Sequence, residues 1–520
     1  MFTFLTLVCC FELKSNSLKF KYLKMKNISL LLVLNILISY SMQAQQMFQQ
    51  FSGNDIGNPK LKGNYQFDEK NQQFTLQGAG YNVWFNRDEF YFVSQEVEGD
   101  FMLSANLEFL GDGIDPHRKI GLMIRSSKSE NAVYMDGAVH GDGLTSLQYR
   151  ERTGGETQEI ATEIKAPEFV QVERKGNEYI FRLSKDREPL VEVGRVTLEM
   201  PGAVLAGMFI CSHNEEVFEK AQFRNVRLEK PAAEGVDGYQ KPSPSRLEIL
   251  NIETGNREVI YETETHIEAP NWSRNGKFLV YNSGGKLYNF NLKKRVPRVI
   301  DTGFATSNNN DHGISFDGKM LAISSGTPVD GRNVSIIYTV PVKGGTPKRV
   351  TEKGPSYWHG WSPDDKWHVY CAERNNNYDV YKIPAEGGEE IRLTTADGLD
   401  DGPEYSPDGK FVYFNSVRSG SMEIWRMKPD GSEQEQVTND EFQNWFAHPS
   451  PDGKWLIMIS YPKEVPASSH PHNQRVMLRL MPADGGEIKT VAFLYGGQGT
   501  INVPSWSPDS QKVAFVSYTY

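Results

Sequence analysis

Cysteine is scarce in this sequence, with only four in 520 residues. Cys9 and Cys10 fall in an N-terminal segment that has the features of a leader, and Cys211 and Cys371 lie in parts of the chain that we assign to different domains. A disulfide framework is therefore not expected, despite the export signal described below. We expect Cys211 and Cys371 to be small buried side chains.

Long apolar runs are lacking as well. The most apolar stretch runs from Ile28 to Tyr40, which is too short for a membrane anchor. It follows a short basic start at Met25 and precedes Ala44 and a pair of glutamines, a pattern typical of a cleaved signal peptide. We therefore predict a leader over residues 1–44 and an exported protein, periplasmic or secreted, with no membrane span after processing.

Positive charge is in short supply. The chain has 56 Lys and Arg against 66 Asp and Glu, a formal net charge of −10. The leader holds five lysines and one glutamate, a net of +4, so the processed chain carries −14. Because binding to nucleic acid depends on cations that neutralise phosphates, we do not expect a nucleic acid partner.

Aromatic residues, glycine and proline are abundant by contrast. Aromatics make up 12% of the chain, which also contains 46 glycines and 27 prolines, and this mixture favours many short strands joined by tight turns. The length exceeds that of one ordinary hydrophobic core and indicates two or three domains. These features predict an all-β globular protein.

Six versions of one sequence unit recur through the second half of the chain. Each contains a turn of the Ser-Pro-Asp-Gly type, and the turns follow one another at intervals of 42, 47, 44, 44 and 57 residues, the length of a propeller blade. A short strand precedes each turn, an alternating strand follows it, and a second pair of strands comes next. The Asp or Asn of the turn is Asn275, Asp317, Asp364, Asp408, Asp452 or Asp509.

The two ends of the repeat region complement each other. The last unit stops at Tyr520 after its first two strands, and the missing pair is supplied by "SRLEILNIETGNREVIYETE" over residues 245–264. We therefore predict a six-bladed β-propeller over residues 245–520. Its last blade is built from both ends of the region, which leaves no strand edge open.

The repeat strings "WSPDDKWHVYCA" and "YSPDGKFVYFNS" resemble the TolB-like (PD40/WD40-like) propeller repeats. The resemblance covers the whole of residues 245–520 and implies the propeller fold. Such repeats occur in binding proteins and in enzymes alike, so an activity has to be argued from a site.

Residues 45–230 lack the blade period. Short alternating strands such as "KIGLMIRSS" and "VQVERKGNEYIFRLS" predict a β-sandwich. On "DIGNPKLKG" and "GLMIRSS" the segment resembles the concanavalin-like jelly-roll modules that accompany secreted carbohydrate-active proteins. Residues 231–244, "PAAEGVDGYQKPSP", have the composition of a linker.

Histidines stand out where the repeats are aligned on the turn. Four units carry Pro or Ala three residues before the turn serine, whereas two carry His312 and His359, and His448 lies one position later in the fifth unit. A single histidine beside a turn is often only a hydrogen-bonding loop residue. Three on neighbouring blades predict that imidazoles converge on one mouth of the channel.

We predict a catalytic and binding surface at this mouth, because loop residues do not fill a propeller core. Aromatic residues there either stack on sugar rings or pack between blades, and the sequence leaves both interpretations open. The predicted catalytic residues are His312, His359, Tyr357 and Arg418. The predicted substrate-binding residues are Trp358, Asp401, Asn444, Trp445, Asn502 and Arg374.

One divalent metal ion is a further hypothesis. His312, His359 and His448 would hold it, with residues from the neighbouring loops as further ligands. No local His-x-Glu-x-His spacing supports the site. The further ligands considered are His470, His472, Asp311, Asp401 and Gln498.

The architecture is similar to that of oligogalacturonate lyase, and the resemblance implies β-elimination on acidic oligosaccharides with a histidine-bound metal. Such chemistry needs a cation near the substrate carboxylate and a base in reach. Arg418 or the metal would supply the cation, His359 or His312 the base, and Tyr357 a proton for the leaving oxygen. With water as the leaving group, the same site would be a dehydratase.

One departure weakens this analogy, because that lyase has seven blades and the sequence predicts six. The alternative is a non-catalytic protein of the TolB-like type that binds a glycan or another envelope protein. The two hypotheses differ in whether the three histidines face one cavity.

Overall fold

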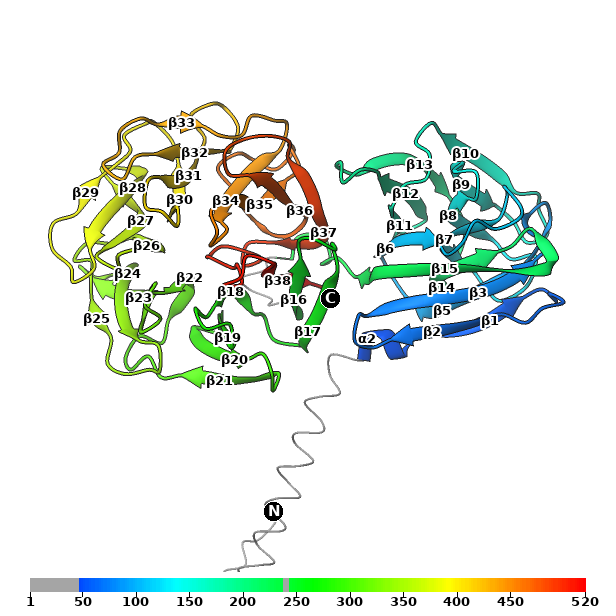
Figure 1. Ribbon diagram of the computed structural model, residues 1–520, viewed down its shortest axis with the longest axis horizontal. Helices are drawn as coiled ribbons and strands as arrows, with labels where there is room; N and C mark the ends of the chain where they lie inside the picture. Colours follow the sequence, from blue (N-terminus) through cyan, green and yellow to red (C-terminus); the bar gives the residue numbers. More distant parts are fainter. Residues whose placement is uncertain (1–45, 237–242) are drawn as a thin grey trace, which may run out of the picture.

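The computed structural model describes residues 46–236 and 243–520, and its regular structure is almost wholly β (Figure 1). Within these ranges the one helix is the four-residue α2 (Gln46–Gln49). The all-β prediction is confirmed. The predicted leader and residues 237–242 of the predicted linker lie outside the described residues. Across the described ranges, no helix is both long and apolar enough to cross a membrane.

Two antiparallel sheets form the N-terminal part. In strand order, the first sheet contains β1 (Ser52–Ile56), β5 (Arg87–Val97), β14 (Val204–Cys211), β7 (Lys119–Arg125), β8 (Tyr134–His140), β9 (Thr145–Arg150) and β10 (Gln158–Thr162), and β4 (Asn82–Trp84) pairs with β5. The second contains β13 (Val191–Thr197), β12 (Glu178–Ser184), β11 (Phe169–Lys175), β6 (Phe101–Phe109), β15 (Asn214–Glu229), β3 (Gln73–Gly80) and β2 (Asn64–Asp68).

The two sheets share one hydrophobic core. Leu76 of β3 and Leu103 of β6 meet Val93 of β5 and Leu122 of β7 in it, and all four are fully buried. Alternation places these residues inside, since β3 buries every second residue over most of its length. This part is therefore a two-sheet sandwich, and its relationship to jelly-roll modules stays a prediction.

The C-terminal part is a ring of six blades, which confirms the predicted propeller (Figure 1). Blade 1 contains β18 (Glu268–Trp272), β19 (Phe278–Ser283), β20 (Lys286–Asn291) and β21 (Val296–Ile300). Blade 2 contains β22 (Asn308–Ile314), β23 (Met320–Val329), β24 (Arg332–Pro341) and β25 (Lys348–Arg349). Blade 3 contains β26 (Ser356–Trp361), β27 (Trp367–Arg374), β28 (Asn377–Pro384) and β29 (Ile391–Arg392).

The remaining blades complete the ring. Blade 4 contains β30 (Asp400–Tyr405), β31 (Val412–Ser416), β32 (Glu423–Met427) and β33 (Glu435–Gln436). Blade 5 contains β34 (Gln443–Pro449), β35 (Trp455–Tyr461), β36 (His472–Pro482) and β37 (Lys489–Gly497). Blade 6, the closing blade, contains β38 (Lys512–Tyr518), β16 (Ser245–Asn251) and β17 (Arg257–Thr263), with an inner bridge from Trp506 to Val513.

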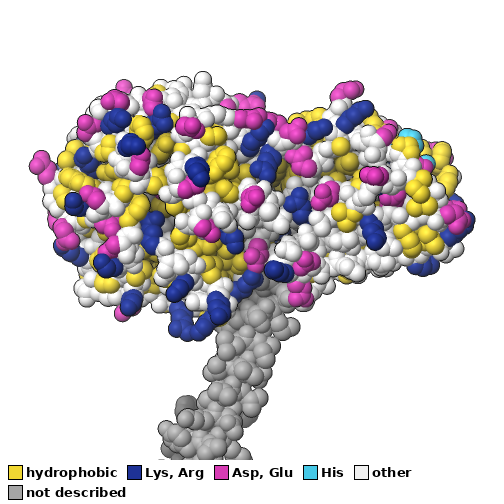
Figure 2. All heavy atoms as spheres, in the orientation of Figure 1, with side chains coloured by type: hydrophobic (Ala, Val, Ile, Leu, Met, Phe, Trp, Pro, Cys, Tyr) yellow, Lys and Arg dark blue, Asp and Glu magenta, His cyan; other side chains and the backbone are white. Residues whose placement is uncertain are grey.

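The closing blade joins the two ends of the propeller. β16 pairs antiparallel with β38 in a register that runs from Ser245 opposite Tyr518 to Asn251 opposite Lys512. The sandwich lies beside this blade (Figure 1), and the two parts adjoin in the space-filling view (Figure 2). Arg227 of β15 donates to Glu248 of β16 at 2.7 Å, and both side chains are fully buried.

The repeated turns hold the blades in register through their own polar side chains. In blade 3, Oγ of Ser362 donates to Oδ1 of Asp364 at 2.6 Å and accepts from the backbone N–H of Trp367 at 2.9 Å. The equivalent serines in blades 4 and 5 accept in the same way, at 3.0 Å. The turn aspartates therefore serve the fold, as Asp at this position does in many turns.

Candidate functional site

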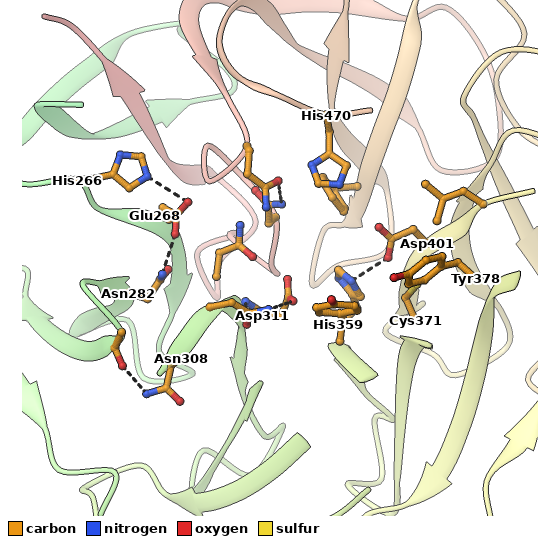
Figure 3. Close-up of a pocket in the computed structure, with 18 of the residues that line it drawn as sticks. His266, Glu268, Asn282, Asn308, Asp311, His359, Cys371, Tyr378, Asp401 and His470 are labelled. Atoms are coloured by element: carbon orange, nitrogen blue, oxygen red, sulfur yellow. Dashed lines mark hydrogen bonds and ion pairs between the residues drawn. The ribbon is translucent and has the colours of Figure 1, made fainter. Parts of the chain in front are cut away.

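One end of the propeller channel forms a cavity of about 820 Å³ (Figure 3). It is lined by the first residues of the inner strands β18, β22, β26 and β30, together with Phe446 of β34 and residues of two loops of blades 5 and 6. None of the described residues that line it is a lysine or an arginine. The cavity wall is therefore mixed, with aromatic and apolar side chains beside acidic and imidazole ones, and its described lining carries no fixed positive charge.

Irregular strand pairing directs side chains toward this cavity. The ladder between β26 and β27 is interrupted between Trp358 and Gly360, so that His359 lies in a bulge. In blade 4 the ladder is interrupted directly after Asp401. A bulge changes the direction of a side chain, which is why such positions are frequent beside functional sites.

A carboxylate with two imidazoles forms the first polar group of the site, which we call the triad. Nε2 of His266 and Nε2 of His472 each lie 3.1 Å from Oε1 of Glu268. Nδ2 of Asn282 donates to the other oxygen, Oε2, at 2.8 Å. The three ligand atoms of the triad lie within 4.8 Å of one another. Burial opposes ionisation of Glu268, but the hydrogen bonds from the two imidazoles outweigh it and hold its pKa well below the usual range.

A buried imidazole–carboxylate pair forms the second group. Nε2 of His359 lies 3.1 Å from Oδ1 of Asp401. Burial lowers the pKa of His359, but the charge of Asp401 outweighs this effect and the net pKa is raised. Burial likewise opposes ionisation of Asp401, and the attraction of His359 holds its pKa below the usual value. Each member of the pair therefore favours the charged form of the other.

Asp311 lies between these two groups (Figure 3). Burial, reinforced by the charge of Asp401, raises its pKa to about 7, although His359 acts in the opposite direction. Oδ2 of Asp311 accepts from Asn309 at 2.6 Å. Tyr357 also lines the cavity, and burial raises its pKa, so the phenol keeps its proton near neutral pH.

His470 lies on a third wall of the cavity. Its ring packs edge-on against Trp445 and Phe446, with centroid distances of 4.5 and 5.4 Å. Burial lowers its pKa, so the ring is neutral. Cys371 lies near Asp401, and burial raises the pKa of its thiol well above the usual value. Cys371 is therefore not a nucleophile in this state.

Four of the predicted site residues line the cavity, namely Tyr357, His359, Asp401 and Asn502. His312 and His448 do not join them, so the expected convergence of His312, His359 and His448 is wrong. The three described histidines that line the cavity are instead His266, His359 and His470. His312 lies in the regular ladder opposite Ile323, since the bulge in blade 2 ends one residue earlier than the one that holds His359. Its Nε2 lies 3.2 Å from the Val280 carbonyl, and burial lowers its pKa to about 4.

His448 lies in the ladder of blade 5, one position further along the strand. Its Nδ1 is 2.6 Å from Oε2 of Glu404, and its Nε2 is 2.5 Å from the carbonyl oxygen of Ile501. Both ring nitrogens are therefore occupied by protein groups. The predicted metal set of His312, His359 and His448 is not assembled.

The remaining predicted residues lie outside the cavity wall. Trp358 is buried, lines a second pocket together with residues of the repeat turns, and donates from Nε1 to Nδ1 of His368 at 3.0 Å. Trp445 is fully buried behind His470. The others are held in polar networks: Asn444 with Glu423 and Arg479, Arg374 with Glu390, and Arg418 with Asp400.

The sequence analysis missed His266 and Glu268. The sequence does indicate this pair, because "HIE" spans His266 to Glu268 where the inner strand β18 of the first repeat begins. Residues two apart in an extended segment lie on the same side, so this spacing brings an imidazole and a carboxylate together. The third member, His472, was named only as a further ligand.

Comparison with known proteins supports the fold assignment. The TolB β-propeller domain family model matches residues 359–472. An uncharacterized protein of Agrobacterium fabrum is 47% identical over 275 residues, which cover 53% of this chain and 92% of the relative. The chain belongs to the TolB-like β-propeller family.

Solved structures agree with this assignment. The match to a candidate TolB of Agrobacterium tumefaciens is 47% identical with a TM-score of 0.52, and it covers 54% of this TolB-like chain and 99% of that chain. An oligogalacturonate lyase of Vibrio parahaemolyticus is 14% identical with a TM-score of 0.33, and the match covers 52% and 77% of the two chains. The second similarity is too low to indicate a shared activity.

Proposed function

We propose that this TolB-like protein is an exported, metal-dependent lyase that cleaves uronate-containing oligosaccharides by β-elimination in the channel cavity. The main support for the proposal is that a possible metal site and an imidazole–carboxylate pair suited to proton transfer lie at one cavity. His266 and Glu268 of the triad line one wall, with His472 hydrogen-bonded to Glu268, and the pair of His359 and Asp401 lies on the other, with Asp311 between them (Figure 3).

An acidic substrate requires a cation in this cavity. The described lining residues include no lysine or arginine, whereas Glu268, Asp311 and Asp401 are all acidic. A substrate carboxylate would be repelled unless a metal ion neutralised it. Arg418 cannot serve, because it is paired with Asp400 at 2.7 Å and does not line the cavity.

The triad fits a divalent ion. Two imidazole nitrogens and one carboxylate oxygen form a donor set that suits manganese, iron or zinc. Glu268, His266 and His472 would hold the ion, and Asn282 would support it by orienting the carboxylate through Oε2 of Glu268. When bound, the ion would act as a Lewis acid that neutralises the uronate carboxylate and acidifies the adjacent C–H.

Asp311 and the pair of His359 and Asp401 are suited to the two proton transfers of the reaction. Asp311, with a pKa of about 7, is suited to accept the proton on the carbon next to the substrate carboxylate. The protonated His359, held by Asp401, is suited to donate a proton to the leaving oxygen as its bond to carbon breaks and a carbon–carbon double bond forms. Tyr357, which also lines the cavity, offers its hydroxyl as a further proton donor.

Product masses test this proposal. The purified chain would be incubated with Mn²⁺ and a panel of uronate oligosaccharides, and the products would be weighed by mass spectrometry. Elimination gives two products whose masses add up to that of the substrate, hydrolysis adds one water to that sum, and a dehydratase removes one water from an uncleaved substrate. Saturable binding with no product would instead support the alternative, a non-catalytic glycan-binding protein.

A further inference from the structure

The members of the triad belong to blades that do not adjoin in the ring. Glu268 is the first residue of β18 in blade 1, and His266 lies just before it. His472 is the first residue of β36 in blade 5. The closing blade lies between them, and it is assembled from the two ends of the propeller. The triad therefore spans the junction at which the ring is closed.

A tyrosine of the closing blade also packs against the two histidines of the triad. The ring of Tyr518, the last residue of β38, stacks on His266 at a centroid distance of 4.9 Å and lies 6.2 Å from His472. Its hydroxyl donates to the carbonyl of Gln498 at 2.8 Å. Any opening between β38 and its neighbours would therefore disturb both imidazoles.

The residue after His472 is fixed by both ends of the propeller. Asn473 has a φ of 61°, in the left-handed region, and its side chain holds this turn. Its Nδ2 donates to Oη of Tyr520 at 3.0 Å, and its Oδ1 accepts from Oγ of Ser243 at 3.0 Å. Tyr520 ends the given sequence, and Ser243 lies just before β16, so Asn473 links His472 to both strands of the junction.

We infer that a metal ion in the triad is also a clamp that closes the propeller ring. This inference rests on the metal site of the proposed function. An ion bound by His266, Glu268 and His472 joins blade 1 to blade 5 across the closing blade. Because coupling between two equilibria is reciprocal, the metal stabilises the pairing of β16 with β38, and loosening that junction weakens metal binding by the same factor.

Hydrogen exchange of the full chain, with and without Mn²⁺, tests the clamp. At free metal ten times its Kd, amides that exchange only when the junction opens should slow by about tenfold. The slowing should be concentrated in β16, β17 and β38. Amides of β27 and β28 in blade 3, across the ring from the junction, should change little. Equal slowing in all blades, or no slowing at the junction, would overturn the clamp.

Variants separate the clamp from the lyase proposal. Glu268→Gln should abolish the metal-dependent slowing, whereas Ser468→Ala, a cavity residue outside the triad, should leave it intact. Tyr520→Phe removes one hydroxyl contact of Asn473 and should weaken Mn²⁺ binding about two- to tenfold, the range of one hydrogen bond. Unchanged Mn²⁺ affinity in Tyr520→Phe would contradict the coupling.

Calorimetry with Mn²⁺ distinguishes the two possible failures. If the ion binds but protection is not focused at the junction, the clamp is wrong and the lyase proposal stands. If the wild-type chain does not bind Mn²⁺ at all, the clamp and the metal site fall together, whatever the product assay shows.

Discussion

Nε2 of His359 lies 3.1 Å from Oδ1 of Asp401 in a wall of the channel cavity, and the two side chains are only 5% and 12% exposed. The pair joins neighbouring blades, with the imidazole in a bulge of blade 3 and the carboxylate in β30 of blade 4, directly before the interruption of its ladder. A carboxylate beside an imidazole favours the protonated form of the imidazole and raises its pKa. This relationship makes His359 a proton donor in the proposed reaction.

Replacing Asp401 should shift the pH dependence of the reaction. Asp401 raises the pKa of His359, and the donor form exists below that pKa. Asp401→Asn should therefore lower the pKa of His359 and move the falling alkaline limb of kcat/KM to lower pH. The rate should fall by about 10²-fold or more at neutral pH. An unmoved alkaline limb would show that His359 is not the donor, and the exposed Asp397→Asn serves as the matched control.

Asp311 should make the protein less stable as the pH rises. Its folded pKa of about 7 lies above the ordinary value of 3.8, so its stabilising contribution is complete below pH 3.8 and is lost as the pH rises through 7. The difference between these two pKa values corresponds to up to about 4 kcal/mol. Asp311→Asn should therefore raise the free energy of unfolding at pH 8 and do little at pH 4.

Urea unfolding at several pH values measures this difference. Asp330→Asn, on an exposed loop of blade 2, should leave the pH dependence as in the wild type. If Asp311→Asn gives the same gain at pH 4 and pH 8, then Asp311 does not titrate near neutrality and is not suited to be the base.

Asn282 should support metal binding without touching the metal. It donates to Oε2 of Glu268 at 2.8 Å and so orients the carboxylate of the triad. Asn282→Ala should weaken Mn²⁺ binding by about 10- to 100-fold, as expected when a supporting hydrogen bond is lost. Isothermal titration calorimetry measures the affinity. Equal affinities in variant and wild type would mean that the triad does not hold the ion.

His448 should matter for stability and not for the metal. It is hydrogen-bonded to Glu404 and to the Ile501 carbonyl, and it does not line the cavity. His448→Ala leaves Glu404 as a buried, unpaired carboxyl and should lower the free energy of unfolding by about 3–5 kcal/mol. The folded fraction should bind Mn²⁺ as tightly as the wild type. Loss of metal binding without loss of stability would instead place His448 in the metal site.

The propeller could be predicted from the sequence because its evidence is repeated six times. Each turn of the Ser-Pro-Asp-Gly type fixes where one strand ends and the next begins, and the incomplete last unit shows how the ring closes. The same redundancy is missing at the site. A shift of one residue in the position of a bulge decides whether a histidine faces the cavity, as with His359, or stays in the ladder, as with His312. No local sequence pattern marks that shift.

The partners of the arginines could not be predicted from the sequence. Arg374 ends β27 and Arg418 follows β31, and each is paired with a carboxylate of its own blade, so neither is available to a substrate. The triad could be predicted only in part, because it combines the His-x-Glu spacing of blade 1 with a histidine from blade 5. Such a combination depends on which blades the closing blade brings near each other.

The proposed β-elimination requires both a metal in the triad and the His359–Asp401 pair. The ultraviolet absorbance of the unsaturated uronate product can be followed in the wild type, Glu268→Gln and Asp401→Asn, with Mn²⁺ added or chelated. From this mechanism we expect a rise in the wild type that chelation abolishes, no rise in Glu268→Gln, and a slow rise in Asp401→Asn. A rise that persists in Glu268→Gln or after chelation would contradict it, as would no rise with any uronate substrate by a wild-type chain that has bound Mn²⁺.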